Sequence, residues 1–166
     1  MPEKRTIKKA RQDKRAGKAA STQAGEFVHE EIEHIRKGKH GARSAKQAIA
    51  IGLSKARRAG VDLKPPKKGE ASSKTRESAK SAYEKGQKNE PISKTRSRAR
   101  EKALKKEPRS AVSHQALSKQ ARSAAKKRTA TDRSAAAKKL LIQKDPGDAP
   151  SPLKKQPEQE RRPNLL

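Results

Sequence analysis

Apolar residues recur with a helical period in residues 44–60 of this chain. Small and apolar side chains stand at Ala45, Ala48, Ile49, Gly52, Leu53, Ala56 and Ala59. A period near 3.6 places them on one stripe of a helix, with basic residues off the stripe. Ser44 and Gln47 have the spacing of a capping box, and Gly60 stands where a left-handed residue would end the helix. Gly52 on the stripe indicates close approach of a second helix, from this chain or from a second copy in a homodimer.

A second helical stripe precedes the first, in residues 21–37. Its apolar members are Ala24, Phe27, Val28, Ile32 and Ile35, and four glutamates precede the basic end of the segment. That charge order suits the helix dipole, and Gly38 is placed to end the helix. The short, glycine-rich link 38–43 then predicts an αα-hairpin over residues 21–64, with Val61 and Leu63 folding back over the pair. The acidic first helix is expected to hold the basic second helix in register.

The remaining segments have weaker patterns. Residues 1–20 read as a basic arm with only Ile7 to bury, and residues 65–92 as a linker with a weak helix from Ser72 to Lys85. Residues 93–144 read as a tail rich in Lys, Arg, Ala and Ser, with helical propensity over 93–107, 110–128 and from Asp132 onward. Residues 145–166 lack periodicity and are expected to be disordered. The predicted fold class is mostly α with extensive disorder: a small αα-hairpin between basic, low-complexity arms.

Composition supports a small core and a polyanionic partner. Only 20 of the 166 residues are Leu, Ile, Val or Phe, and nine of those lie between Phe27 and Leu63. A chain so poor in large apolar residues and so highly charged is expected to be largely disordered. Lys and Arg number 45 against 18 Asp and Glu, a net charge of +27. Such an excess makes the chain a counterion-releasing ligand for nucleic acid.

Several classes of function are disfavoured by the sequence. There is no cysteine, so there is neither a disulfide framework nor a cysteine metal site. No apolar run suggests a membrane span or a secretory signal, and we expect a cytoplasmic, nucleoid location. His29 and His34 are five residues apart, about 140° round a helix, so they fail the zinc-protease spacing. His40 and His114 are isolated in the sequence. We expect no enzymatic activity, cofactor, metal or small-molecule substrate.

The candidate binding residues are cations positioned to contact phosphates. Arg43 and Lys46 stand at the start of the second helix, where free backbone N–H groups also favour phosphate. Gln47 is the only amide suited to reading bases and has a capping role, so phosphate contacts are favoured over sequence reading. The full predicted set is Lys39, Arg43, Lys46, Lys55, Arg57, Arg58, Arg96, Arg98, Arg100, Lys105, Lys106, Arg122, Lys126, Lys127, Arg128, Arg133, Lys138 and Lys139.

The segment from Lys46 to Arg57 carries a recognisable motif. It reads Lys-Gln-Ala-Ile-Ala-Ile-x-Leu-Ser-x-Ala-Arg and resembles the core of a family of small, basic bacterial proteins that are largely uncharacterised. The preceding GEFVHEEIEHIRKGKHGARS is similar to the longer members of that family, which are often labelled DNA-binding. The tail resembles linker-histone tails and bacterial histone-like proteins in composition. The resemblance implies DNA binding and brings no active site.

Three functions remain open from the sequence. The leading one is a non-enzymatic, largely sequence-independent DNA-binding protein of the nucleoid. The second is an RNA-binding or ribosome-associated accessory factor, because both polyanions present phosphates. The third is a protein-interaction adaptor whose hairpin would dock on a partner through Phe27, Ile32, Ile35, Ile49 and Leu53.

Overall fold

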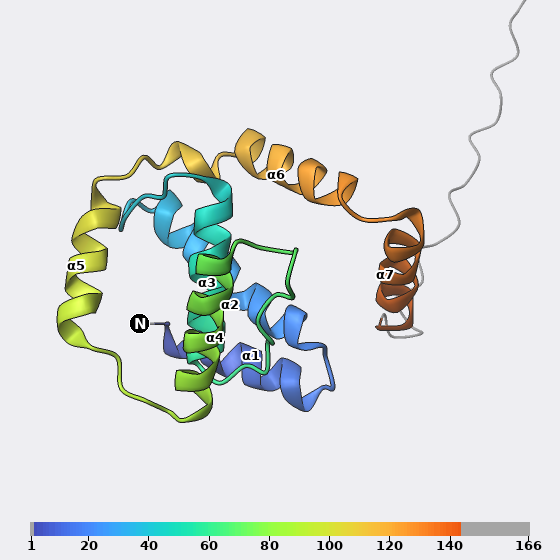
Figure 1. The fold of residues 1–166 in the computed structure, drawn as a ribbon, viewed down its shortest axis with the longest axis horizontal. Coiled ribbons are helices and arrows are strands. Elements are labelled where there is room, and N and C mark those ends of the chain that lie inside the picture. The colour runs from blue at the N-terminus through green and yellow to red at the C-terminus, as the bar shows by residue number, and fades with distance from the viewer. Residues whose placement is uncertain (1, 144–166) are drawn as a thin grey trace, which may run out of the picture. The chain divides into compact units, whose positions relative to one another are not determined.

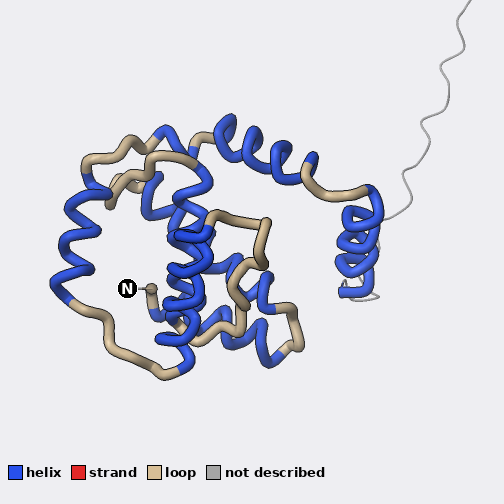
Figure 2. Tube along the Cα trace, viewed as in Figure 1, coloured by secondary structure: helices blue, strands red, loops and turns tan. Residues whose placement is uncertain are grey.

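The computed structural model describes residues 2–143, whose regular structure is helical apart from one isolated β-bridge (Figures 1 and 2). The elements are α1 (Lys4–Arg15), α2 (Ala20–Arg36), α3 (Ala45–Arg58), α4 (Ser73–Gln87), α5 (Lys94–Lys105), the 3₁₀ turn η1 (Ser110–Val112), α6 (His114–Lys126) and α7 (Ala130–Gln143). The predicted mostly α class is confirmed. The segment predicted to be disordered, 145–166, lies outside the described residues. The chain divides into two compact units at Arg128, and α7 belongs to the second.

The helices α2 and α3 pack on each other and are joined by the predicted glycine-rich link. Gly38 and Gly60 both have left-handed φ angles, +75° and +84°, directly after these helices. The Ser44 hydroxyl accepts a hydrogen bond from the Gln47 N–H, and the Gln47 side chain accepts one from the Arg43 N–H at 2.6 Å. The predicted hairpin is therefore present, with its helix ends set by these glycines and by the cap.

Gly52 is the point of closest approach between the two helices. A Cβ atom at Gly52 would lie 2.6 Å from the Cα of Val28 in α2. A methyl group at this position would therefore meet the backbone of the neighbouring helix rather than a flexible side chain. The close approach that Gly52 indicated in the sequence is therefore made by α2 of the same chain.

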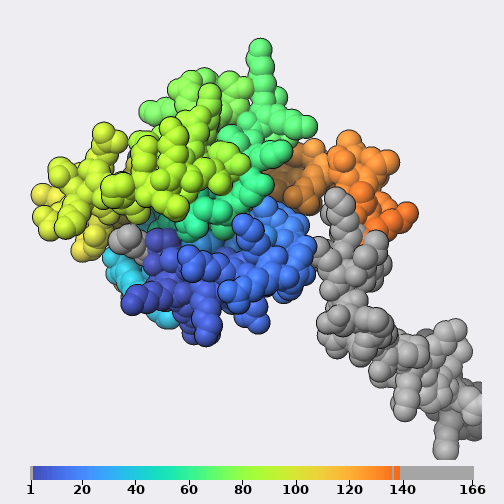
Figure 3. All heavy atoms as spheres, turned by 90° about the horizontal axis from the view of Figure 1, so that it is seen from below, coloured from blue at the N-terminus to red at the C-terminus, as the bar shows by residue number. Residues whose placement is uncertain are grey.

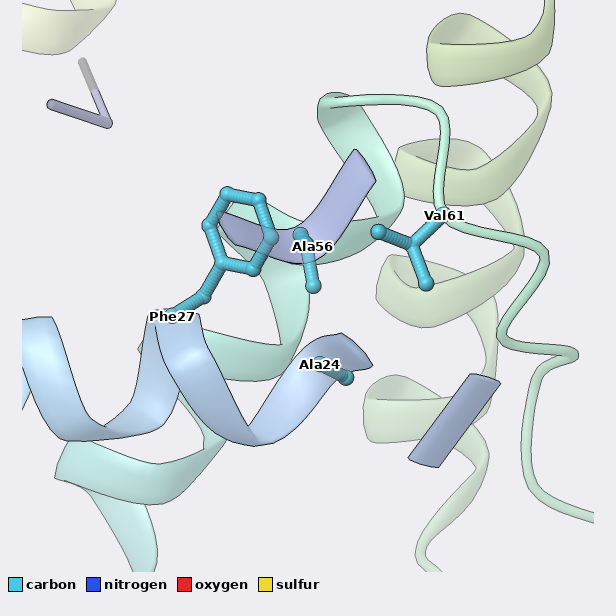
Figure 4. Packing of buried hydrophobic residues seen from close by; sticks show 5 residues of the cluster. Ala24, Phe27, Ala56 and Val61 are labelled. Atoms are coloured by element: carbon cyan, nitrogen blue, oxygen red, sulfur yellow. The ribbon is translucent and has the colours of Figure 1, made fainter. Parts of the chain in front are cut away.

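Two apolar clusters hold the hairpin together, one at each end. In the first, Ala24 and Phe27 of α2 face Ala56 of α3 and Val61, which folds back as predicted (Figure 4). The second contains Ile35 and Ala48 together with Ala42, Ala111 and Val112. Both clusters include residues from outside the hairpin. These residues complete the core, although the hairpin itself has few large apolar side chains.

The N-terminal segment is a packed helix rather than a free basic arm. α1 contacts α2, and Ala10 joins the cluster around Phe27 with Ile7 partly buried beside it. Thr6 and Asp13 are also buried. The prediction from the sequence counted only large apolar residues, whereas α1 packs through small and short ones.

The segment 65–92 is likewise more ordered than a linker. α4 packs on α3, which lies between α2 and α4, and it buries Ala79 and Ala82 (Figure 1). Gly86 permits this contact, because a Cβ there would overlap the carbonyl oxygen of Arg57. The Tyr83 hydroxyl donates a hydrogen bond to Asp62 at 2.6 Å.

The single helix predicted over 110–128 is broken in the structure. η1 ends at Val112, and α6 begins after Ser113, whose hydroxyl accepts a hydrogen bond from the Ala116 N–H. The break lets Val112, only 2% exposed, insert between α2 and α3. In α7, Thr129 rather than Asp132 is the capping residue, since the Thr129 hydroxyl accepts from the Asp132 N–H.

Candidate nucleic-acid interface

The positive charge is concentrated in the first compact unit. Residues 129–166 hold eight Lys or Arg against five Asp or Glu, a net charge of +3. The remaining 128 residues hold 37 basic and 13 acidic residues, a net charge of +24. The first compact unit therefore carries most of the charge that could bind a polyanion.

A basic groove runs between the start of α3 and one side of η1 and α6. It is shallow and open to solvent, with a volume of about 470 Å³. Its lining residues are Arg43, Ser44, Ala45, Lys46, Ser110, Ala111, Ala116, Lys119, Gln120 and Ser123. The three charged members are all cations, and the polar members are hydroxyl or amide groups that can bond a phosphate. We refer to this set as the basic groove.

The N-terminal end of α3 adds backbone N–H donors to the basic groove. The first amides of a helix have no partner within it, and Ala45 and Lys46 hold these positions. The positive end of the helix dipole points the same way. The side chains of Lys46 and Lys119 are exposed, and Arg43 is also exposed, with Glu107 3.6 Å away. The groove therefore combines mobile cations with fixed N–H donors, a combination suited to an anion.

Two of the predicted binding residues, Lys55 and Arg57, instead bond to groups inside the fold. Lys55 lies with its Nζ 2.6 Å from Oε2 of Glu31, which is fully buried. Arg57 is 7% exposed and donates hydrogen bonds to the carbonyl oxygens of Leu63 and Lys64 at 2.9 and 3.3 Å. Burial lowers the pKa of the Arg57 guanidinium below its usual value. Neither side chain is presented to a phosphate, because each compensates a group inside the fold.

The other predicted cations differ in how exposed they are and in whether they are ion-paired. Lys39 is exposed but ion-paired with Glu3 at 3.1 Å, and Arg58 is half-buried. Lys105 pairs with Glu101 at 3.0 Å, and hydrogen bonding and charge from Lys105 lower the pKa of Glu101. The side chain of Lys139 lies outside the described part. The remaining predicted residues are exposed: Arg96, Arg98, Arg100, Lys106, Arg122, Lys126, Lys127, Arg128, Arg133 and Lys138.

One exposed basic face was missed by the sequence analysis. Lys4, Lys8, Arg11 and Arg15 share one side of α1, which lies at the surface in dark blue in Figure 3. Their spacing of four, three and four residues is the helical one. That spacing is readable in the sequence, but it only becomes a surface once Thr6, Ala10 and Asp13 anchor the opposite side. We refer to these four residues as the α1 basic face.

A second missed feature is a cluster of acidic and histidine side chains. Glu30, Glu31 and His34 of α2 were given no role at a site in the sequence, but Glu31 is fully buried and the other two nearly so. Within the same region of the fold, the His40 ring lies beside the Glu31 carboxylate and the His34 ring beside the Glu3 carboxylate. We refer to Glu3, Glu30, Glu31, His34 and His40 as the acid–histidine cluster. Of the histidines compared in the sequence, His29 alone is exposed on α2.

Hydrogen bonds stabilise the outer edge of the acid–histidine cluster. The Glu3 N–H donates to Glu30 at 3.1 Å, and the Glu3 carboxylate contacts His34 at 2.8 Å and Lys39 at 3.1 Å. The hydrogen bond with His34, followed by that from Lys39, lowers the pKa of Glu3 to about 2. The cluster thus ties the residue before α1 to α2 and to the link that follows it.

Comparison with protein-family models, curated proteins and solved structures found no match to this chain. In the described part of the chain, no helix combines the length and the apolar character needed to cross a membrane.

Proposed function

We propose that this protein is a non-enzymatic nucleic-acid-binding protein that contacts phosphates of a duplex, with DNA of the nucleoid as its target. The basic groove carries the proposal, because it places three cations and the N-terminal end of α3 along one open surface groove. The net charge of +24 on residues 1–128 supports it by favouring release of counterions from a polyanion.

The aromatic residues favour a duplex over a single strand as the ligand. Single-strand binding usually depends on exposed aromatic rings that stack on bases. Phe27 is 1% exposed, and the hydroxyl of Tyr83, the one tyrosine in the chain, is bonded to Asp62. Phe27 cannot stack on a base, and one partly exposed tyrosine does not provide a platform for successive bases, which favours phosphate contacts as the main source of affinity.

The adaptor alternative loses support from the packing of the hairpin. Of its five proposed docking residues, Phe27 and Ile35 are at most 1% exposed within the chain, and Ile32, Ile49 and Leu53 are half-buried. Among the side chains that the structure describes, Ile92 is the one large apolar residue at the surface, 37% exposed. Within the side chains that the structure describes, the hairpin therefore offers no broad apolar face to a protein partner.

A salt titration with paired variants tests the proposal. Binding of a labelled DNA duplex is followed by fluorescence anisotropy over a series of salt concentrations. The affinity of the wild type should fall steeply, with a log–log slope of about −0.9 for each phosphate neutralised. The double variant Lys46→Ala, Lys119→Ala should lose affinity and about two units of slope.

The control variant removes the same charge outside the basic groove. Lys74→Ala with Lys88→Ala changes two exposed lysines at the ends of α4. Equal losses in both double variants would contradict a role for the groove, and a salt-independent affinity would contradict phosphate binding altogether. Competition with a structured RNA of equal length decides between the two polyanions, and stronger binding to RNA would overturn the choice of DNA.

A further inference from the structure

The acid–histidine cluster brings three potential metal ligands together. Ligand atoms of Glu31, His34 and His40 all lie within 4.8 Å of one another. His40 Nε2 is 3.4 Å from Oε1 of Glu31. This separation matches the distance between neighbouring ligands of a tetrahedral zinc ion, about 3.4 Å for bonds of about 2.0–2.1 Å.

Both imidazole rings are oriented by an acceptor on their outer nitrogen. His34 Nε2 lies 2.8 Å from the Glu3 carboxylate, and His40 Nδ1 lies 3.1 Å from the carbonyl oxygen of Gly41. Each acceptor requires a proton on the nitrogen that it faces. The other nitrogens, His34 Nδ1 and His40 Nε2, are then the ones that carry lone pairs in the neutral rings. A carboxylate or a backbone carbonyl behind each ring is the usual support of a metal-bound histidine.

The inner nitrogens face buried carboxylates instead of hydrogen-bond donors. His34 Nδ1 is 3.9 Å from Oε1 of Glu30, and His40 Nε2 faces Oε1 of Glu31. Glu31 is 0% exposed, and these two carboxylate oxygens make no hydrogen bond of acceptable geometry. A lone pair directed at a buried oxygen is repulsive, and either a proton or a metal ion between the two atoms removes the repulsion.

The charged groups around the site also sum to a net negative charge, which favours a bound cation. Glu3, Glu30 and Glu31 supply three negative charges, while Lys39 and Lys55 supply two positive ones. With neutral histidines the group has a net charge of −1, within a chain of +27. Lys55 occupies Oε2 of Glu31 and leaves Oε1 toward His40.

We propose that Glu31, His34 and His40 form a binding site for one divalent transition-metal ion, with zinc as the best match. Glu31 Oε1, His34 Nδ1 and His40 Nε2 are the three protein ligands, and water completes the tetrahedron. Two nitrogens and one oxygen suit zinc better than magnesium or calcium, which prefer oxygen ligands. The ion joins α2 to the link before α3, and through Glu3 it also holds the segment before α1.

Calorimetry on the untagged full-length protein tests the site. Zn²⁺ is titrated into apoprotein near neutral pH, with Mg²⁺ as a second probe. One Zn²⁺ per chain should bind, and Mg²⁺ should bind far more weakly. His40→Gln should weaken Zn²⁺ binding by more than about 100-fold, and Glu3→Gln, which removes an orienting partner, by about 10-fold or more.

The matched control is His29→Gln combined with His114→Gln, two exposed histidines outside the cluster. It should bind Zn²⁺ as tightly as the wild type. Equal weakening in this control and in His40→Gln would show adventitious surface binding and overturn the proposal, as would the absence of Zn²⁺ binding.

Nuclear magnetic resonance of the wild type tests the same site without any substitution, so its result does not depend on whether a variant folds. On zinc binding, the nitrogen shifts should identify His34 Nδ1 and His40 Nε2 as the coordinating atoms. Imidazolium spectra that persist with excess Zn²⁺ would show that protons, not a metal, fill the positions between the rings and the carboxylates, and would overturn the site.

Discussion

Lys55 on α3 reaches Glu31 on α2, with its Nζ 2.6 Å from Oε2 of a carboxylate that is fully buried. A buried carboxylate that loses its cation is strongly destabilising, because no water replaces the partner. This ion pair therefore connects the two hairpin helices, and its charges have the signs that the two segments indicated.

The first prediction concerns this pair. Lys55→Met should lower the free energy of unfolding by about 3 kcal/mol, since it leaves Glu31 buried without its ammonium partner. Urea unfolding in the presence of a chelator measures the change. Lys46→Met, on the exposed side of the same helix, should change stability by less than about 0.5 kcal/mol.

A second substitution separates lost charge from lost packing. Adding Glu31→Leu to Lys55→Met should restore most of the stability, because an apolar pair of similar volume needs no compensation. If the double variant is less stable than Lys55→Met alone, the ion pair is not the cause of the loss.

The second prediction compares two glycines within helices. Gly52→Ala should destabilise the protein by about 1–3 kcal/mol, because its Cβ would lie 2.6 Å from the Cα of Val28. Gly25→Ala, where nothing lies within 4 Å of the added atom, should stabilise it by about 0.5–1 kcal/mol. Thermal unfolding of the two variants gives the comparison, and shifts of the same sign would contradict the close approach of α2 and α3.

The third prediction uses the only tyrosine, in a chain without tryptophan. The hydrogen bond from Tyr83 to Asp62, followed by burial and the charge of Asp62, raises the pKa of the phenol above its usual value. The stability that this bond contributes is present below the pKa of the unfolded chain and is lost as pH rises through the folded-state pKa.

Absorbance of the tyrosinate form measures that titration directly. Asp62→Asn should move the midpoint toward the value found in urea, because the charge of Asp62 is removed and its hydrogen bond is weakened. An identical midpoint in native and unfolded wild-type protein would contradict the contact between α4 and the segment after α3.

The fourth prediction concerns the α1 basic face. Replacing Lys4, Lys8, Arg11 and Arg15 by Gln should weaken DNA binding and reduce the salt slope by up to about 0.9 for each cation that contacts a phosphate. Stability should change little, because these side chains are exposed. Anisotropy titrations provide the measurement. The matched control replaces Lys67, Lys74, Lys80 and Lys88, and a larger loss in that control would place the DNA elsewhere.

Much of the hairpin could be predicted because its signals are local. Gly38, Gly60 and the Ser44–Gln47 pair act within a few residues, and the stripes of α2 and α3 follow one period. The packing of α1 and α4 could not be predicted in the same way, since Ala10, Ala79 and Ala82 bury too little area to stand out in a sequence.

The candidate sites depended on contacts that no spacing reveals. Arg43 and Lys46 were identified from the helix start, but Lys119 joins them only because η1 breaks the helix predicted over 110–128. Lys55 and Arg57 were counted as surface cations because the sequence does not show which charges have a buried counterpart. His40 meets Glu31 only because the chain turns at Gly38 between them.

The link before α3 is held from outside the hairpin by two backbone hydrogen bonds, from the Gly41 N–H to Leu104 and from the Ala42 N–H to Pro108. α5 is thereby anchored on both sides, by α4 before it and by this junction after it, although none of its own residues is buried. α5 therefore carries its arginines on a backbone that is held at both ends. A polyanion would then meet a helix that is already formed, so binding would not have to order the backbone of α5, and only its side chains would lose rotational freedom.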